Sequence, residues 1–208
     1  STSGDHVSYS IPDHTESYNP NADWARIFKG SETGTLADWA FISWATDLQP
    51  HIDNKVKRLS AYEAASSNEA IGGVTVPKFW NPKYNPATWQ HLITYTIGYS
   101  KDAYTWQGSP LFDTEWQTNP DILANNYAGD FAKFYSGSVT WPNVDVTGTD
   151  ETNRSSELWH AALNSRGKFY PVDSEARLTK AFEEIFEKVS SDNKPGTSSA
   201  ATSGSSVS

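Results

Sequence analysis

The stretch that decides the fold covers residues 156–189 and reads SELWHAALNSRGKFYPVDSEARLTKAFEEIFEKV. Its first part predicts a helix that runs through residues 157–164. Ser155 or Ser156 is suited to cap its start, because a hydroxyl can accept a hydrogen bond from an unpaired N–H of the first turn. Gly167 lies where a left-handed residue commonly ends a helix, so we assign it the C′ position.

The second part of the stretch predicts a short strand followed by an amphipathic helix. Residues 168–172 are mostly aromatic or β-branched and form the strand. Asp173 or Ser174 then caps a helix that continues to Val189. Its predicted apolar face is continuous and consists of Leu178, Ala181, Phe182, Ile185, Phe186 and Val189.

Two earlier elements extend this pattern towards the N-terminus. Apolar residues alternate with Thr across residues 91–99, which predicts another strand. Residues 35–48 have an apolar stripe at helical spacing, with Thr33 or Thr35 as the cap and Pro50 as the stop. Strands that alternate with helices predict an α/β fold, with a mainly parallel sheet flanked by helices.

The rest of the chain suggests three regions. Residues 1–32 are an irregular polar N-terminal segment, and residues 33–189 are the α/β part. We expect long insertions at about 51–88 and 100–154, with short helices near 59–65 and 120–135. Residues 190–208 are rich in Ser, Ala, Gly and Thr and are expected to be a flexible linker.

Composition excludes several classes of function. The 208 residues carry a formal net charge of −9, which disfavours binding to nucleic acid. There is no Cys, so disulfides and thiolate chemistry are excluded. No apolar run approaches the roughly 18 residues that a membrane span requires. The chain does not begin with Met and has no signal peptide, so we expect a mature piece or a fragment of a longer protein.

Several segments together resemble one family. Residues 156–189 look like the end of a von Willebrand factor A-type domain, with a Gly-aromatic strand, a capped turn and a final amphipathic helix. Residues 157–167 (ELWHAALNSRG) are similar to a signature of the PilC/PilY-type pilus tip proteins. Three further segments resemble that family in the same order: LADWA at 36–40, TDLQP at 46–50 and PATWQHLITYTIG at 86–98.

This resemblance implies a partial A-type, Rossmann-like domain with long loop insertions. It implies a non-catalytic module for adhesion or assembly in a type IV pilus tip-associated protein. Its expected partners are minor pilins, the rest of the tip protein, and host or abiotic surfaces. The expected location is outside the cell, at the cell surface, the pilus tip or the outer membrane.

The chain departs from the family in its metal-binding motif. Complete A-type domains hold a divalent cation through an Asp-x-Ser-x-Ser loop, which this sequence lacks. The resemblance therefore assigns no metal site and no cofactor. The resemblance implies that the first half of the domain is not part of this sequence, so we expect an exposed strand edge that another chain or that half covers.

Candidate site residues are few. His91 and His160 each lie beside a Trp, and a structural role is favoured because no nucleophile or orienting carboxylate is fixed beside either. Three Trp residues in the second insertion are candidate contacts for a partner or a glycan: Trp106, Trp116 and Trp141. The alternative reading of these Trp residues is a hydrophobic cluster that pins the loop. The alternative function is a carbohydrate-binding or carbohydrate-active module that combines exposed Trp with paired carboxylates.

Overall fold

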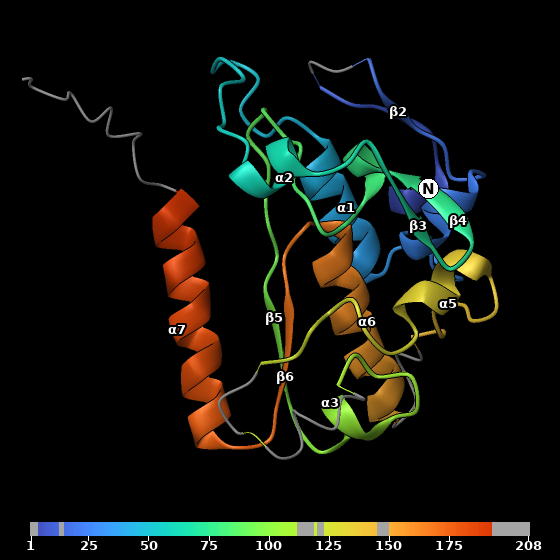
Figure 1. Ribbon diagram of the computed structural model, residues 1–208, viewed down its shortest axis with the longest axis vertical. Helices are drawn as coiled ribbons and strands as arrows, with labels where there is room; N and C mark the ends of the chain where they lie inside the picture. Colours follow the sequence, from blue (N-terminus) through green and yellow to red (C-terminus); the bar gives the residue numbers. More distant parts are fainter. Residues whose placement is uncertain (1–3, 13–14, 112–118, 120–122, 145–149, 193–208) are drawn as a thin grey trace, which may run out of the picture.

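A computed structural model describes residues 4–12, 15–111, 119, 123–144 and 150–192. Its centre is a pair of strands, β5 (Thr96–Tyr99) and β6 (Phe169–Val172). Helix α7 (Glu175–Asp192) covers one face of this pair, while α6 (Glu151–Asn164) and α1 (Leu36–Ala45) lie on the other side (Figure 1). This arrangement confirms a mixed α/β fold in which helices cover both faces of a sheet.

The central pair is parallel, as the order of strands and helices predicts. Thr96 lies opposite Phe169, and Tyr99 lies opposite Val172. Phe169 belongs to the large core next to α6, whereas Tyr170 and Val172 pack with Ala181 of α7. Successive side chains of β6 therefore pack against helices on opposite faces of the sheet, and all four residues of β6 are buried.

The sheet is smaller than we expected from a Rossmann-like fold. The described residues form three two-stranded sheets, and two of these are antiparallel. They pair β1 (Tyr9–Ser10) with β2 (Ser17–Tyr18), and β3 (Asn68–Ile71) with β4 (Val74–Pro77). Among the described residues, the central β5–β6 sheet is parallel but has only two strands, so the larger Rossmann-like sheet is not confirmed.

The expected insertion at 51–88 contains regular structure that our reading missed. The β3–β4 hairpin turns at Gly72 and Gly73, whose φ angles are +58° and +80°. Two residues with positive φ form the turn type that matches the twist of a two-residue hairpin. A short 3-10 helix, η3 (Lys78–Trp80), then places the Trp80 side chain in the core.

The N-terminal segment is irregular but contributes to the core. Besides β1 and β2, it contains the 3-10 helices η1 (Gly4–His6) and η2 (Asp23–Ile27). Tyr18, Ile27 and Phe28 are at most 1% exposed and pack in the large core cluster. Although its composition is polar, this segment is part of the same packed unit as α1 and α6.

The strand predicted at 91–99 is regular only from Thr96 onwards. The preceding backbone bonds to other partners: the Leu92 N–H donates to the Ser43 carbonyl, and the Thr94 N–H donates to the Ser165 hydroxyl. The first hydrogen bond to the neighbouring strand segment is the one that the Thr96 N–H donates to the Lys168 carbonyl, at 3.1 Å. A β-strand forms only where another strand pairs with it. The alternation of apolar and polar residues in the sequence does not show where that pairing begins.

Helix α6 begins earlier than we predicted, and its cap is a different residue. The Asp150 side chain accepts bonds from the N–H groups of Thr152 and Asn153 and therefore acts as the N-cap. Ser155 and Ser156 lie inside the helix and are buried. A carboxylate at this position also interacts favourably with the positive end of the helix dipole.

The end of α6 corrects our assignment of Gly167. Arg166 takes the left-handed conformation with φ of +65°, so it is the C′ residue. Its N–H donates to the Leu163 carbonyl, and the Gly167 N–H donates to the Ala162 carbonyl at 2.8 Å, which together form a Schellman motif. Gly167 is required for a different reason, because a Cβ there would overlap the backbone of Thr94.

The remaining helices follow the sequence more closely. Thr35 caps α1 as predicted and forms a capping box with Asp38, although α1 ends at Ala45, well before Pro50. The Ser174 hydroxyl accepts the Arg177 N–H at the start of α7, as predicted. The short helices are α2 (Ser60–Ala64), α3 (Asp102–Thr105) and α5 (Phe131–Ser136).

Candidate functional site

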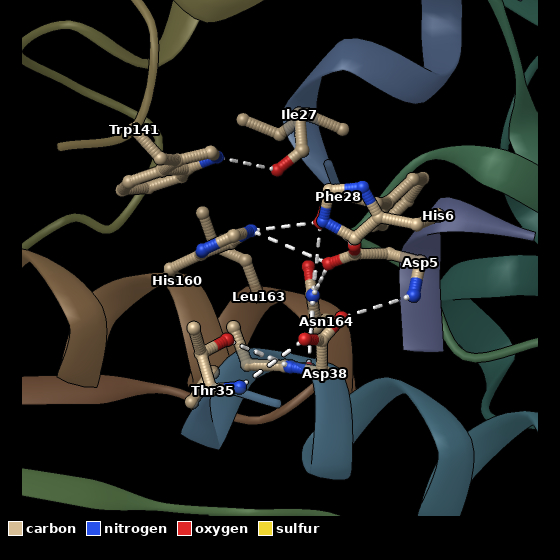
Figure 2. A network of polar contacts seen from close by, with 12 residues as sticks. Asp5, His6, Ile27, Phe28, Thr35, Asp38, Trp141, His160, Leu163 and Asn164 are labelled. Atoms are coloured by element: carbon tan, nitrogen blue, oxygen red, sulfur yellow. Dashed lines mark hydrogen bonds and ion pairs between the residues drawn. The ribbon is translucent and has the colours of Figure 1, made fainter. Parts of the chain in front are cut away.

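A buried cluster of polar side chains joins three distant parts of the chain (Figure 2). It brings together η1, the first turn of α1 and the last two turns of α6. Asp5, Asp38, His160 and Asn164 are each at most 1% exposed. Buried polar groups must be hydrogen-bonded to be tolerated, so this cluster fixes how the three parts meet.

Asp38 organises the start of α1. Its Oδ2 atom accepts the N–H groups of Gly34 and Thr35, while its own N–H donates to the Thr35 hydroxyl. Its Oδ1 atom accepts the Asp5 N–H at 3.4 Å. Gly4 is held tightly against this carboxylate: its φ is +66°, and a Cβ there would overlap Asp38.

Asp5 has the least satisfied carboxyl group of the cluster. Its Oδ2 atom accepts the Asn164 amide at 3.0 Å. Its Oδ1 atom is buried and has no hydrogen-bond partner among the described residues. Burial raises the pKa of the Asp5 carboxyl to about 9, and the neighbouring Asp38 carboxylate shifts it in the same direction.

His160 and Asn164 tie the N-terminal segment to α6. The Nε2 atom of His160 lies 2.8 Å from the Phe28 carbonyl, which can only accept, so Nε2 carries a proton. The Asn164 amide donates to the same carbonyl at 3.1 Å and to the Ala37 carbonyl. The His160 ring also stacks on Trp141, with ring centroids 4.3 Å apart.

Glu157 completes the connection between α6 and α1. Its carboxylate accepts the Ala37 N–H at 2.7 Å, and its other oxygen lies 3.7 Å from Nδ1 of His160. Burial alone raises the pKa of Glu157, but the His160 imidazole and the Ala37 N–H outweigh burial and leave it below its ordinary value.

His91 lies outside this cluster and also has backbone and amide partners. Its Nδ1 atom donates to the Trp89 carbonyl at 2.7 Å, and its Nε2 atom accepts from the Asn85 amide at 2.8 Å. Burial lowers the pKa of His91. Both ring nitrogens are occupied, so the geometry favours the structural role that the sequence indicates.

The three candidate Trp residues have different places. Trp141 is 2% exposed, stacks on Phe134 as well as His160, and donates to the Ile27 carbonyl at 2.8 Å. Both its faces are occupied, so it is a core residue and cannot act as a platform for a sugar. Trp106 is half-buried with Phe169 beside it, and Trp116 lies outside the described residues.

Sequence reasoning missed two features of this site. Asp5 gave no signal, because a lone acidic residue in a polar segment is ordinary. Arg166 was read only as part of a signature, yet its guanidinium is buried between Trp44 and Phe28, 3.9 Å and 4.7 Å from their ring centroids. Burial lowers the pKa of Arg166 to about 9.

Part of the exposed surface of α7 is apolar. Phe182, Phe186 and Val189 are 45%, 67% and 44% exposed, although the sequence predicts them on the core-facing side. Leu178, Ala181 and Ile185 do pack against β6 and its surroundings. The predicted apolar face is therefore split: one half covers the sheet, and the other half forms a stripe on the outside.

A cavity of about 530 Å³ lies beside one end of this stripe. Val189 contributes to its wall, together with Leu59 and Leu92, which are also exposed apolar residues.

None of the helices in the described ranges has the length and the apolar character that a membrane span requires.

Comparisons with known proteins identify relatives of this chain. It is 34% identical over 199 residues to type IV pilus biogenesis factor PilY1 of Pseudomonas aeruginosa strain PAK, which is 96% of this chain and 15% of that protein. The corresponding protein of strain UCBPP-PA14 is 34% identical over 206 residues, again 96% of this chain and 15% of the relative. No family model and no solved structure matches the chain. This chain is thus similar, along nearly all of its length, to about one seventh of a PilY1 pilus biogenesis factor.

Proposed function

We propose that this chain is a non-catalytic assembly and adhesion module of a type IV pilus tip-associated protein. Similarity to PilY1 over 96% of the chain supports a role in type IV pilus biogenesis. The signature at residues 157–167, which resembles PilC/PilY-type proteins, lies on α6 and the turn after it, and most of its residues are buried. The proposed location is outside the cell, at the surface or the pilus tip.

The observation that carries this proposal is the apolar stripe on α7. Three large apolar residues at spacings of four and three positions form one continuous face, because residues so spaced are neighbours on a helix. Exposed apolar faces of this kind mark contact surfaces. The matched relatives are about seven times longer than the aligned region, so we propose that the stripe packs against another part of the same tip protein.

An A-type domain is the architecture we propose for this assembly. The parallel β5–β6 pair, with helices on both faces, is consistent with a piece of such a sheet. The outer edge of β5 and the α7 stripe would then be covered by strands and helices from elsewhere in the tip protein. This proposal makes the chain a structural part whose exposed surface is completed by its neighbours.

The absence of catalysis is also a proposal, and three contacts support it. His160 and His91 donate to backbone carbonyls, and the Glu157 carboxylate accepts a backbone N–H. Groups held in this way lock segments together. A general base requires a proton to abstract within reach, and these side chains face the protein's own backbone.

The test is a pair of substitutions made in the complete pilus protein. Phe182→Ser with Phe186→Ser removes the stripe, and Glu183→Gln with Glu187→Gln is the matched control on exposed positions of the same helix. We expect the first pair to reduce surface piliation strongly and the second to leave it unchanged. Circular dichroism of the 208-residue chain should be unchanged by both pairs. Normal piliation with the Ser pair would refute the proposed contact.

A further inference from the structure

We propose that Asp5, Asp38 and His6 form a binding site for a divalent transition-metal ion, with Mn²⁺ and Zn²⁺ as the best fits. One ligand atom from each of the three residues lies within 4.8 Å of the others. The site is built from η1 and the first turn of α1. It shares no residue with an Asp-x-Ser-x-Ser loop, which this chain lacks.

The first argument is charge. Asp5 and Asp38 are both 1% exposed, and an oxygen of each carboxyl group lies within 4.8 Å of the other. Two carboxylates cannot both be ionised side by side in a buried place unless a positive charge compensates them. Either a shared proton or a bound cation can compensate the two carboxyl groups.

The second argument is an unused ligand atom. Oδ1 of Asp5 is buried and accepts no hydrogen bond from the described residues. Nε2 of the His6 imidazole lies 3.2 Å from this oxygen. The proton on Nε2 points instead to the Glu32 carbonyl at 2.9 Å, because a carbonyl can only accept.

The spacing fits a common metal ion. Ligand atoms that each lie about 2.0–2.2 Å from an ion are about 3 Å apart when they are neighbours. The 3.2 Å between Asp5 Oδ1 and His6 Nε2 already meets this requirement. To bind the ion, His6 has to hold its proton on Nδ1, which frees Nε2. The Glu32 carbonyl, 2.9 Å from Nε2, is then placed as an additional oxygen ligand.

Access and ligand type narrow the choice of ion. The His6 side chain is 17% exposed, so the site opens to solvent on that side while both carboxylates are enclosed. Carboxylate and carbonyl oxygens suit Mg²⁺, Ca²⁺ and Mn²⁺, whereas imidazole suits Zn²⁺ and other late metals. A mixed set of two carboxylates, one imidazole and one carbonyl therefore favours Mn²⁺ or Zn²⁺ over the alkaline-earth ions.

The test is thermal unfolding of the metal-free 208-residue chain with added MnCl2 or ZnCl2. At a concentration a hundred times the Kd, we expect Tm to rise by roughly 5–10 °C and to return to its starting value with a chelator. Calorimetry should give one ion per chain, with proton release, because the ligands must be deprotonated to bind. CaCl2 and MgCl2 should have smaller effects, and a larger effect with either would overturn the assignment of the ion.

Two variants and a control decide whether these residues are the ligands. Asp5→Asn should abolish the rise in Tm, and His6→Ala should weaken binding at least about tenfold. His51→Ala, at an exposed position, should bind like the unchanged chain. The site is supported if, without metal, the Asp5→Asn chain has a higher Tm than the unchanged chain and added metal does not change the Tm of the variant. No change in the Tm of the unchanged chain, or an equal rise in both ligand variants, would refute it and leave a shared proton as the explanation.

Discussion

Gly167→Ala should destabilise the protein severely, although the change adds only one methyl group. A Cβ at Gly167 would overlap the Thr94 carbonyl oxygen, lie 2.7 Å from the Thr94 carbonyl carbon, and meet the Ile93 side chain at 3.3 Å. The first two obstacles are backbone atoms, which cannot rotate away as a side chain can. One of two segments would have to move: the turn after α6 or the segment leading into β5.

The magnitude follows from what that movement disturbs. Overpacking of a well-packed site costs about 1–3 kcal/mol. The Gly167 N–H also closes the Schellman motif on Ala162, and the Thr96–Lys168 bond that starts the parallel pair lies one residue away. We therefore expect a loss at the upper end, about 3 kcal/mol, in the free energy of unfolding.

Urea unfolding followed by Trp fluorescence measures this loss, and Gly73→Ala is the matched control. Gly73 has φ of +80° but nothing within 4 Å of an added Cβ. Its replacement should cost only the backbone penalty of about 1–2 kcal/mol. A Gly167→Ala chain no less stable than the Gly73→Ala chain would show that close approach to Thr94 does not explain this glycine.

Three further predictions concern single side chains. Thr35→Ala removes the cap of α1 and should lower stability by about 0.5–2 kcal/mol, whereas Thr33→Ala, two residues before the cap, should have little effect in the same urea experiment. Trp141→Ala should cost about 3–5 kcal/mol in the free energy of unfolding because the indole is enclosed. On a glycan array, the Trp141→Ala chain should bind sugars as the unchanged chain does wherever it is still folded. Burial lowers the pKa of His91, so its contribution to stability is complete above the unfolded pKa and is lost as pH falls through the lower folded pKa. As pH falls from 7.5 to 5, the urea midpoint of the unchanged chain should therefore decrease relative to that of His91→Gln, which lacks this group. The same pH dependence in both chains would contradict this assignment.

The sequence predicts the fold best where local signals agree with tertiary partners. For α7, the Ser174 cap and the spacing of Leu178, Ala181 and Ile185 predict both the start of the helix and its buried side. The same pattern does not show that Phe182 and Phe186 lie outside. Their exposure depends on how wide the sheet is, and no local pattern records sheet width.

The site was harder to predict because its partners are far apart in the chain. Asp5 meets Asn164 across a separation of 159 residues. Asn164 lies in the signature at 157–167, but Asp5 belongs to no recognisable motif. Arg166 is a different case: a Gly follows it, and Gly is the usual residue with positive φ, so the sequence favoured the wrong position by one. The Gly72–Gly73 pair was a readable hairpin signal, because two such residues between apolar stretches commonly form a two-residue turn.

The long separation of these contacts has a consequence for how the chain folds. The Phe28 carbonyl receives bonds from His160 and Asn164, so the first thirty residues have no complete set of partners until α6 exists. Contacts between distant residues form late and slow the folding of a domain, because a large loop must close before they stabilise anything. During synthesis the N-terminus leaves the ribosome first. Tyr18, Ile27 and Phe28 would therefore stay exposed to solvent until residue 164 has also emerged. Pulse-labelled folding of successively longer nascent chains should show protease resistance arising in one step near that length, with no protected intermediate formed from the first half.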